Sequence, residues 1–180
     1  HTGSGKEKGI QRIVNALEEV FSTLNLETTI LLENVAGAGT AIGSSLQELK
    51  SIFAQLSITE KLGICFDTCH GFAAGYNLRN TAEVEQLLAE IDNLFGLDKL
   101  GVIHANDCKG AVGSNKDRHH HIGYGKIGEK GFKNLLRQPE LEAKPFILET
   151  PVDEQRDDAD NLASLRQLQP KKIRKKSENT

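Results

Sequence analysis

Four short apolar segments each run directly into a side chain that can bind a divalent metal. The segments span residues 28–32, 62–66, 100–103 and 145–148, and the side chains that follow them are Glu33, Asp67, His104 and Glu149. Three carboxylates that converge without a cation would repel one another. A bound metal removes that cost, and carboxylate oxygen with imidazole nitrogen suits zinc or manganese. An acidic residue after one strand is usually a helix cap or a loop residue, but the recurrence after successive segments favours a shared metal site.

A second set of ligand-type side chains lies close to the first in the sequence. His70 follows the second of these carboxylates by three residues, and we expect it in the loop after the strand. Asp117 and His119 are two residues apart, so both side chains can point the same way from an extended segment. With His70 they can form a separate centre that leaves a position for water or phosphate. The adjacent His120 and His121 are more typical of a solvated polar loop.

Two glycine-rich loops and several basic side chains border these residues. The loops span residues 34–43 and 71–76, and glycine in such loops lets backbone amides approach a phosphate closely. Glycines are also common at ordinary strand–helix turns, so a purely structural role stays open. Arg79 and Lys109 can pair with backbone phosphates, and solvation at the surface is the alternative for both.

The elements that must position these residues alternate between strands and helices. The four apolar segments are almost continuously hydrophobic, which is typical of parallel strands buried on both faces. Apolar residues at helical spacing predict helices over residues 10–24, 46–56 and 84–95, with weaker helices over 132–137 and 159–168. Ser45 with Glu48, and Asn80 with Glu83, have the spacing of a capping box at two of the helix starts.

This alternation predicts an α/β fold with a parallel sheet. Four such units, preceded by a helix without its own strand, would make about half of an eight-stranded TIM barrel, in which active sites lie at the C-terminal ends of the strands. A small doubly wound sheet is the structural alternative. We expect one domain over residues 1–168 and a basic, disordered tail over residues 169–180.

Composition bears on the compartment and on the partners. With 180 residues, 38% of them hydrophobic, the chain can bury a sizeable core. No apolar run approaches the length of about 18 residues that a membrane span needs. The cysteines Cys65, Cys69 and Cys108 make no disulfide framework, which suits a reducing, intracellular compartment. Cys65 lies among apolar neighbours, and we expect it to be a small buried hydrophobe.

The charge is unevenly distributed. The net charge is −3, although residues 170–180 hold five basic side chains and one acidic one, so the rest of the chain is more acidic than the total indicates. Such a body would repel a polyanion unless bound cations neutralise its carboxylates. The basic run over residues 171–176 fits a nuclear localisation signal or a nonspecific DNA anchor, with simple solubility as the alternative.

The beginning of the chain has no initiator residue. The sequence contains no Met and opens with His1-Thr2-Gly3-Ser4, without the pattern of a signal peptide. We therefore expect upstream segments to be missing, with a processed start as the alternative.

Longer motifs around the ligand-type residues carry a resemblance to a known family. They are Gly63-Ile64-Cys65-Phe66-Asp67-Thr68-Cys69-His70, Ile103-His104-Ala105-Asn106-Asp107-Cys108-Lys109 with Asp117-Arg118-His119, and the flanking Leu32-Glu33-Asn34 and Ile147-Leu148-Glu149-Thr150. At these residues, and from His1 to about Leu168, the chain resembles the endonuclease IV family of abasic-site DNA endonucleases. The resemblance implies the C-terminal portion of a TIM barrel of the xylose-isomerase-like type.

The resemblance also implies a cluster of three zinc ions, or manganese in their place. Glu33, Asp67, His104 and Glu149 would hold one ion, and Glu33 would bridge to a second ion that His1 also binds. His70, Asp117 and His119 would hold the third. The implied catalytic residues are Glu33 and Glu149. The implied contacts with DNA are Asn34, Gly37, Gly39, Arg79, Lys109 and Arg118.

The reaction that the resemblance implies is hydrolysis of the phosphodiester 5′ to an abasic site, which leaves a 3′-hydroxyl and a 5′-deoxyribose phosphate. Removal of 3′-blocking groups is an expected second activity, and the expected partner is double-stranded DNA with abasic sites, bound by a monomer. Two other functions stay open. A single-metal sugar isomerase or epimerase would need only the first four ligands, and a noncatalytic DNA-binding fragment would rely on the basic tail.

The chain departs from the family pattern in three respects. The family's first three strands, a further histidine ligand and the DNA-penetrating residues of its early loops have no counterpart in the sequence. Cys108 stands where the family usually has Ser or Ala, and Tyr124 stands where an acidic residue is expected.

Overall fold

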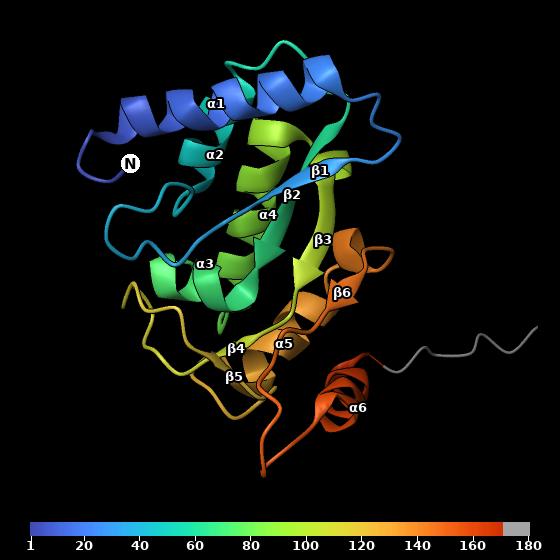
Figure 1. Ribbon diagram of the computed structural model, residues 1–180. Helices are drawn as coiled ribbons and strands as arrows, with labels where there is room; N and C mark the ends of the chain where they lie inside the picture. Colours follow the sequence, from blue (N-terminus) through green and yellow to red (C-terminus); the bar gives the residue numbers. More distant parts are fainter. Residues whose placement is uncertain (171–180) are drawn as a thin grey trace, which may run out of the picture.

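Four parallel strands form the main sheet, and three of them end in a ligand-type side chain. The computed structural model describes residues 1–170 of the chain. The strands are β1 (Ile30–Glu33), β2 (Leu62–Asp67), β3 (Leu100–His104) and β6 (Phe146–Ile147), and they lie side by side in that order (Figure 1). Each neighbouring pair is parallel, with Asp67 beside His104 in register. The C-terminal ends of the four strands therefore meet at one edge of the sheet.

The main helices form a single sequential layer. They are α1 (Lys6–Thr23), α2 (Leu46–Phe53), α4 (Thr81–Phe95), α5 (Gly128–Leu136) and α6 (Asp158–Leu168), and each contacts the next one in this order. Two short 3-10 turns, η1 (Leu97–Lys99) and η2 (Pro139–Leu141), precede β3 and β6. A doubly wound sheet reverses its strand order at a switch point, whereas here the order is sequential. The TIM-barrel prediction is confirmed, and the doubly wound alternative is wrong.

The predicted helix starts are only partly correct. Ser45 caps α2 by accepting a hydrogen bond from the N–H of Glu48, and Asn80 caps α4 by accepting one from the N–H of Ala82. The return bond of a capping box is absent at α2, because the Glu48 carboxylate instead accepts from the N–H groups of Gly43 and Ser44. The helix predicted over residues 132–137 begins earlier, at Gly128.

A helix occupies the segment that we expected to be a loop. Helix α3 spans Thr68–Ala74, so His70 lies on a helix, and the glycine-rich loop expected over residues 71–76 is mostly helical. Asp67 starts this helix, because its Oδ1 accepts a hydrogen bond of 2.8 Å from the N–H of His70. A side chain at Gly71 would collide with the ring of Phe66. This glycine therefore serves close packing of α3 on β2 rather than the approach of a phosphate.

A small second sheet holds the segment that contains His119. Strands β4 (Asp107–Cys108) and β5 (His119–His120) pair antiparallel. The buried carboxylate of Asp107 accepts hydrogen bonds from five backbone amides that surround it, those of Cys108, Gly123, Gly125, Ile127 and Gly128. This carboxylate therefore fixes the loop that follows β5.

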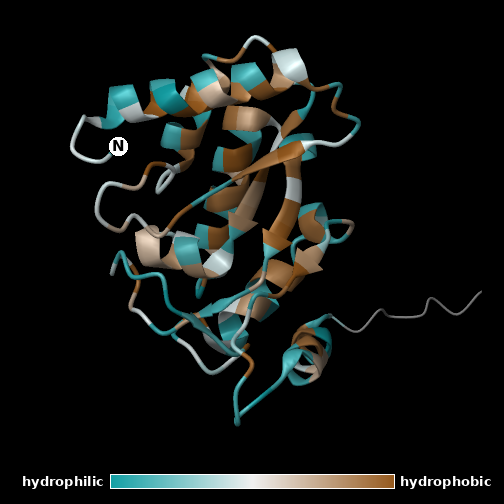
Figure 2. Cartoon of the chain, in the orientation of Figure 1, coloured by the Kyte–Doolittle hydropathy of each residue, from teal (hydrophilic) through white to brown (hydrophobic). Residues whose placement is uncertain are grey.

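The core is built from the strands and the inner faces of the helices. Figure 2 shows β2 and β3 as strongly hydrophobic and α1 as mixed in character. Leu31 of β1 packs across two neighbouring strands, where a Cβ at Gly63 or at Gly101 would lie 2.7 Å or 2.8 Å from its Cδ2 atom. Cys65, Cys69 and Cys108 are buried and free, as the sequence predicts for Cys65.

Two expectations concern the tail and the membrane. The basic run over residues 171–176 lies outside the described residues. Within residues 1–170, no helix combines the length and the apolar character that crossing a membrane requires.

Candidate metal centre

The first group of ligand-type side chains gathers at the C-terminal edge of the main sheet. Glu33, Asp67 and His104 are the last residues of β1, β2 and β3, and Glu149 lies two residues beyond β6. One potential ligand atom from each lies within 4.8 Å of the others. His104 Nδ1 lies 3.2 Å from Glu33 Oε1 and 3.3 Å from Glu149 Oε2. The structure thus brings together the four residues that the sequence singles out.

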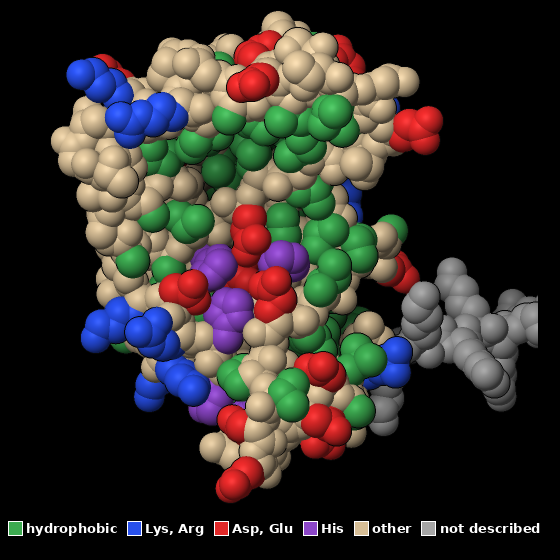
Figure 3. Space-filling view, viewed as in Figure 1, with side chains coloured by type: hydrophobic (Ala, Val, Ile, Leu, Met, Phe, Trp, Pro, Cys, Tyr) green, Lys and Arg blue, Asp and Glu red, His purple; other side chains and the backbone are tan. Residues whose placement is uncertain are grey.

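A second group forms beside the first. His70 comes from α3, His119 from β5, and Asp117 from the segment just before β5. Asp117 Oδ2 lies 3.3 Å from His70 Nε2, and its Oδ1 lies 3.5 Å from His119 Nε2. Their ligand atoms also lie within 4.8 Å of one another. Figure 3 shows acidic and histidine side chains gathered on one face of the molecule.

Two carboxylates connect the groups into one cluster. Glu33 Oε1 lies 3.2 Å from Nδ1 of His104 and 3.2 Å from Nδ1 of His70. Asp67 Oδ2 lies 3.9 Å from His104 Nδ1 and 3.8 Å from His119 Nε2. Because single oxygen atoms face imidazoles of both groups, the cluster can hold more than one cation through shared ligands.

The electrostatics of the cluster follow from its burial and its charge. Burial lowers the pKa of His70, but the hydrogen bond with Glu33 and the charges of Asp67 and Asp117 outweigh this effect and raise the pKa to about 9. Burial raises the pKa of Glu33, but His70 and His104 outweigh it and hold the pKa below its usual value. Asp67 is fully buried, and burial raises its pKa despite the nearby histidines. A cation would replace the proton that His70 otherwise keeps.

The chemistry of the donors fits a divalent metal bound through oxygen and nitrogen. Two further groups of potential ligands contain a thiol, that of Cys65 or Cys69. Burial and nearby carboxylates raise the pKa of Cys65 to about 12, and a hydrogen bond with Cys108 together with burial raises the pKa of Cys69 still further. Metals bind the thiolate form, and the raised pKa values disfavour this form of both thiols in the metal-free chain. Carboxylates and imidazoles at these spacings suit zinc.

His1 belongs to none of the groups formed within residues 1–170. Its terminal ammonium donates a hydrogen bond of 2.8 Å to the carbonyl of Thr40, and its side chain packs against Gly9. The Nδ1 atom of His1 is buried and has no hydrogen-bond partner in this part of the chain.

Asn34, an expected DNA contact, is buried beneath the cluster. Its Oδ1 accepts a hydrogen bond of 2.7 Å from the N–H of Asp67, and its Nδ2 donates one of 3.1 Å to the carbonyl of Asp67. Its own carbonyl accepts from His70 Nδ1 at 2.9 Å. The side chain therefore holds the end of β2, and the backbone carbonyl contacts His70 of α3.

The other expected DNA contacts lie toward the surface. Gly37 and Gly39 adopt positive φ angles of 81° and 59° in the loop after β1. Lys109 and Arg118 are exposed on adjacent segments joined by a backbone hydrogen bond of 2.9 Å. Arg79 is exposed and lies over the ring of Phe72.

One buried amide in the cluster was not singled out from the sequence. Asn106 is fully buried, and its side chain contacts both Asp67 and Glu149. The available signal was a polar residue just beyond a strand end, inside a motif that also contains His104 and Asp107.

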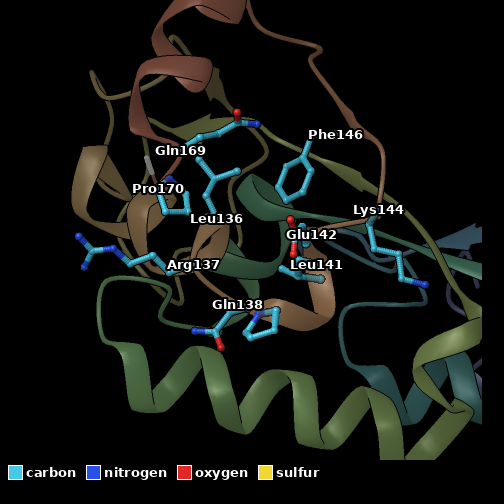
Figure 4. A pocket seen from close by; sticks show the side chains of 10 residues that line it. Leu136, Arg137, Gln138, Leu141, Glu142, Lys144, Phe146, Gln169 and Pro170 are labelled. Atoms are coloured by element: carbon cyan, nitrogen blue, oxygen red, sulfur yellow. The ribbon is translucent and has the colours of Figure 1, made fainter. Parts of the chain in front are cut away.

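The cavity in Figure 4 is distinct from the cluster. It has a volume of about 430 Å³ and lies between the end of α5, η2 and the end of α6, with Leu136, Phe146 and Pro170 among its lining residues. None of the seven cluster residues lines it. The cluster instead reaches the surface through Asp117 and Glu149, which are its most exposed members.

Comparisons with known proteins agree with this architecture. A family model described as a xylose isomerase-like TIM barrel matches residues 1–170. The chain is 47% identical over 169 residues to a probable endonuclease 4 of Methanoculleus marisnigri, covering 93% of this chain and 60% of that protein. It is 50% identical over 165 residues to a probable endonuclease 4 of Halothermothrix orenii, covering 92% and 59%.

A solved structure gives the same result. The chain superimposes on the crystal structure of endonuclease IV from Thermus thermophilus with a TM-score of 0.76 and 34% identity, covering 88% of this chain and 57% of that one. The chain thus spans about 60% of the length of the relatives that it matches. The resemblance expected from the motifs is confirmed.

Proposed function

Because the chain belongs to the xylose isomerase-like TIM barrel family, we propose that it functions in a zinc-dependent endonuclease that hydrolyses DNA on the 5′ side of abasic sites. The observation that carries this proposal is the joined cluster, in which two groups of ligand-type side chains meet through Glu33 and Asp67. The similarity to endonuclease 4 proteins over more than nine-tenths of the chain supports the same function.

The zinc ligands in this proposal follow the two groups. Glu33, Asp67, His104 and Glu149 hold one ion, and His70, Asp117 and His119 hold another. Glu33 faces both groups, so it is the residue suited to bridge toward a third ion. Bound zinc lowers the pKa of a coordinated water to about 7 and offsets the charge of the phosphate.

The chain's own residues supply the positions and charges for this chemistry. Asp67 is fully buried, whereas the Glu149 side chain is 49% exposed and is the most accessible member of the first group. Glu149 therefore lies where a substrate phosphate would meet the cluster. Glu33 stays ionised, since its pKa lies below the usual value. These positions support catalytic roles for Glu33 and Glu149.

The surface beside the cluster suits a polyanion. In Figure 3, basic side chains lie on the same face as the cluster. In this proposal, Lys109, Arg118 and Arg79 contact backbone phosphates, and the loop with Gly37 and Gly39 brings backbone amides close to the DNA. The partner is double-stranded DNA with an abasic site, whose unpaired sugar is easier to extrude than a paired nucleotide, and a monomer binds it.

The alternative function, a sugar isomerase on the same barrel, explains the first group of ligands but not the second. Such an enzyme needs one divalent metal, which the first group alone can hold. It does not require His70, Asp117 and His119 to converge at the distances observed. The second group therefore favours the nuclease.

Metal analysis of the purified chain, paired with a nicking assay, tests the proposal. The substrate is a duplex with one abasic site, and the expected result is bound zinc together with a cut that leaves a 3′-hydroxyl. Glu149→Gln should abolish the cut and leave the fold intact, and cleavage that persists in this variant contradicts the role of Glu149. One metal per chain together with aldose–ketose conversion would establish the isomerase instead.

A further inference from the structure

The side chain of Asn106 links the ends of two strands beneath the cluster. It is fully buried and lies two residues beyond the end of β3. Its Nδ2 donates a hydrogen bond of 2.6 Å to Asp67 Oδ2, and its Oδ1 accepts one of 2.8 Å from the N–H of Glu149. The backbone of Asn106 is held in turn by Thr68, whose Oγ1 accepts from its N–H at 2.9 Å and donates to its carbonyl at 2.7 Å.

The contact with Asp67 fixes the orientation of that carboxylate. Asp67 Oδ1 accepts from the N–H of His70 at 2.8 Å, and Oδ2 accepts from Asn106. Each oxygen therefore has one donor that sets the plane of the carboxylate. With this plane set, Oδ2 lies 3.9 Å from His104 Nδ1 and 3.8 Å from His119 Nε2. The oxygen that Asn106 holds is thus the one that faces both groups.

The contact with Glu149 extends the sheet beyond its last strand. Backbone pairing between the segments ends where the N–H of Ala105 donates to the carbonyl of Ile147 at 2.7 Å. Glu149 lies two residues further on, and its N–H bonds to the Asn106 side chain. The side-chain oxygen of Asn106 therefore accepts the hydrogen bond that a backbone carbonyl of the neighbouring segment would accept if the strands continued. It positions a residue that has no strand of its own.

We propose that Asn106 is a positioning residue that holds Asp67 and Glu149 in the arrangement that binds zinc. The inference rests on the proposed function, since it concerns the first zinc site. Only a side chain with one donor and one acceptor, at this length, makes both contacts. Partners that orient metal ligands typically contribute a factor of about 10 to 100 in metal affinity.

The test compares Asn106→Ala with Asn134→Ala in the full 180-residue chain. Asn134 is a matched control, because it is a buried asparagine in α5 whose amide bonds to Leu78 and Thr81 and contacts no ligand. Zinc affinity is measured by competition with a chromophoric chelator, and Co²⁺ absorption in the visible range reports the ligand geometry. Thermal melting reports the stability of each variant.

We expect Asn106→Ala to weaken zinc binding by a factor of about 10 to 100 and to change the Co²⁺ spectrum. Asn134→Ala should lower the melting temperature and leave both metal readouts as in the wild type. Asn106→Asp is the second variant if the alanine variant does not fold, because it keeps the size and the acceptor but loses the donor. It should also change the Co²⁺ spectrum.

The outcomes separate this inference from the proposed function. Wild-type zinc affinity and an unchanged Co²⁺ spectrum in the Asn106 variants, with only a lower melting temperature, would overturn the positioning role. Wild-type protein that binds no zinc would overturn the proposed function itself.

Discussion

The Nε2 atoms of His70 and His119 lie 3.4 Å apart although 49 positions separate the two residues in the sequence. His70 is held by α3 and His119 by the short strand β5. Asp117 lies close to both rings. Two imidazole nitrogens that face each other beside a carboxylate share either a proton or a cation. Replacing one of these histidines therefore tests whether the second group binds a metal.

Replacing His119 by alanine should remove metal from the second group. We expect His119→Ala to retain about one zinc ion fewer per chain than the wild type, because only His70 and Asp117 remain there and structural or catalytic zinc sites use three or four protein ligands. The measurement is metal content by plasma mass spectrometry. His120→Ala is the control, since His120 belongs to none of the groups within residues 1–170. Equal zinc content in both variants would refute the assignment.

The stability of the metal-free chain should fall as the pH rises from about 6.5 to about 9. The pKa of His70 is raised from 6.5 to about 9 in the folded chain. A raised histidine pKa stabilises the fold below the unfolded value, and this contribution is lost as the pH passes through the folded value. One pKa unit corresponds to about 1.4 kcal/mol, which sets an upper bound of about 3 kcal/mol on the loss. Solvent screens the contribution of the exposed partner Asp117, so the expected loss is about 1–2 kcal/mol.

Urea unfolding of the chelator-treated chain at several pH values measures this effect. His70→Gln is the matched variant, and it should show a flatter dependence over the same range. A wild-type profile that does not slope downward there would mean that His70 is not held protonated by its neighbours.

Removing the Asp107 carboxylate should destabilise the chain strongly. Five backbone amides donate to it, and Asp107→Ala leaves several of them buried without an acceptor. Each buried unsatisfied group costs roughly 1–3 kcal/mol, so we expect a loss of about 3 kcal/mol or more. Chemical denaturation measures it, with the exposed Asp98→Ala as control. A loss similar to that of the control would show that the loop does not depend on Asp107.

The basic side chains beside the cluster should contribute to DNA affinity through phosphate contacts. We expect Lys109→Ala and Arg118→Ala each to weaken binding to a duplex regardless of its sequence. Each should also make the negative slope of log affinity against log salt less steep by about 0.9, since one phosphate contact is lost. Fluorescence anisotropy over a salt series measures both effects. Lys61→Ala is the control, because Lys61 is exposed just before β2, at the opposite end of the sheet. A salt slope unchanged in both variants would exclude these contacts.

The strand-end ligands could be predicted from sequence because each follows a continuous apolar segment. Parallel strands that are buried on both faces have this pattern, and their C-terminal ends must meet at one edge. Glu33, Asp67 and His104 meet there. The convergence of His70 with Asp117 and His119 was harder to predict. It depends on pairing between β4 and β5, which are only two residues long and have no periodicity to detect.

Helix α3 was missed because its signals are local contacts rather than a pattern of apolar residues. It spans seven residues and is capped by Asp67, which is also a ligand-type residue. The metal-ligand reading of Asp67 did not reveal its role as a helix cap. Gly71 indicated a loop, yet it is required where the helix packs on Phe66. The role of Asn106 likewise depends on which atoms it contacts across 39 and 43 positions of sequence, and spacing along the chain does not reveal such contacts.

Leu31 packs against Gly63 and Gly101, so the side-chain sizes at these three positions, on three strands, depend on one another. An alanine at Gly101 would need a smaller residue at position 31, or β1 would have to shift. At Gly63 the backbone carbonyl of Lys99, 2.8 Å from the added Cβ, would have to move as well. Glu33 lies on the same strand, two residues further along. The substitutions that are tolerated near the cluster are therefore restricted by a leucine that offers no ligand atom. Among related sequences, the residues at these three positions should co-vary.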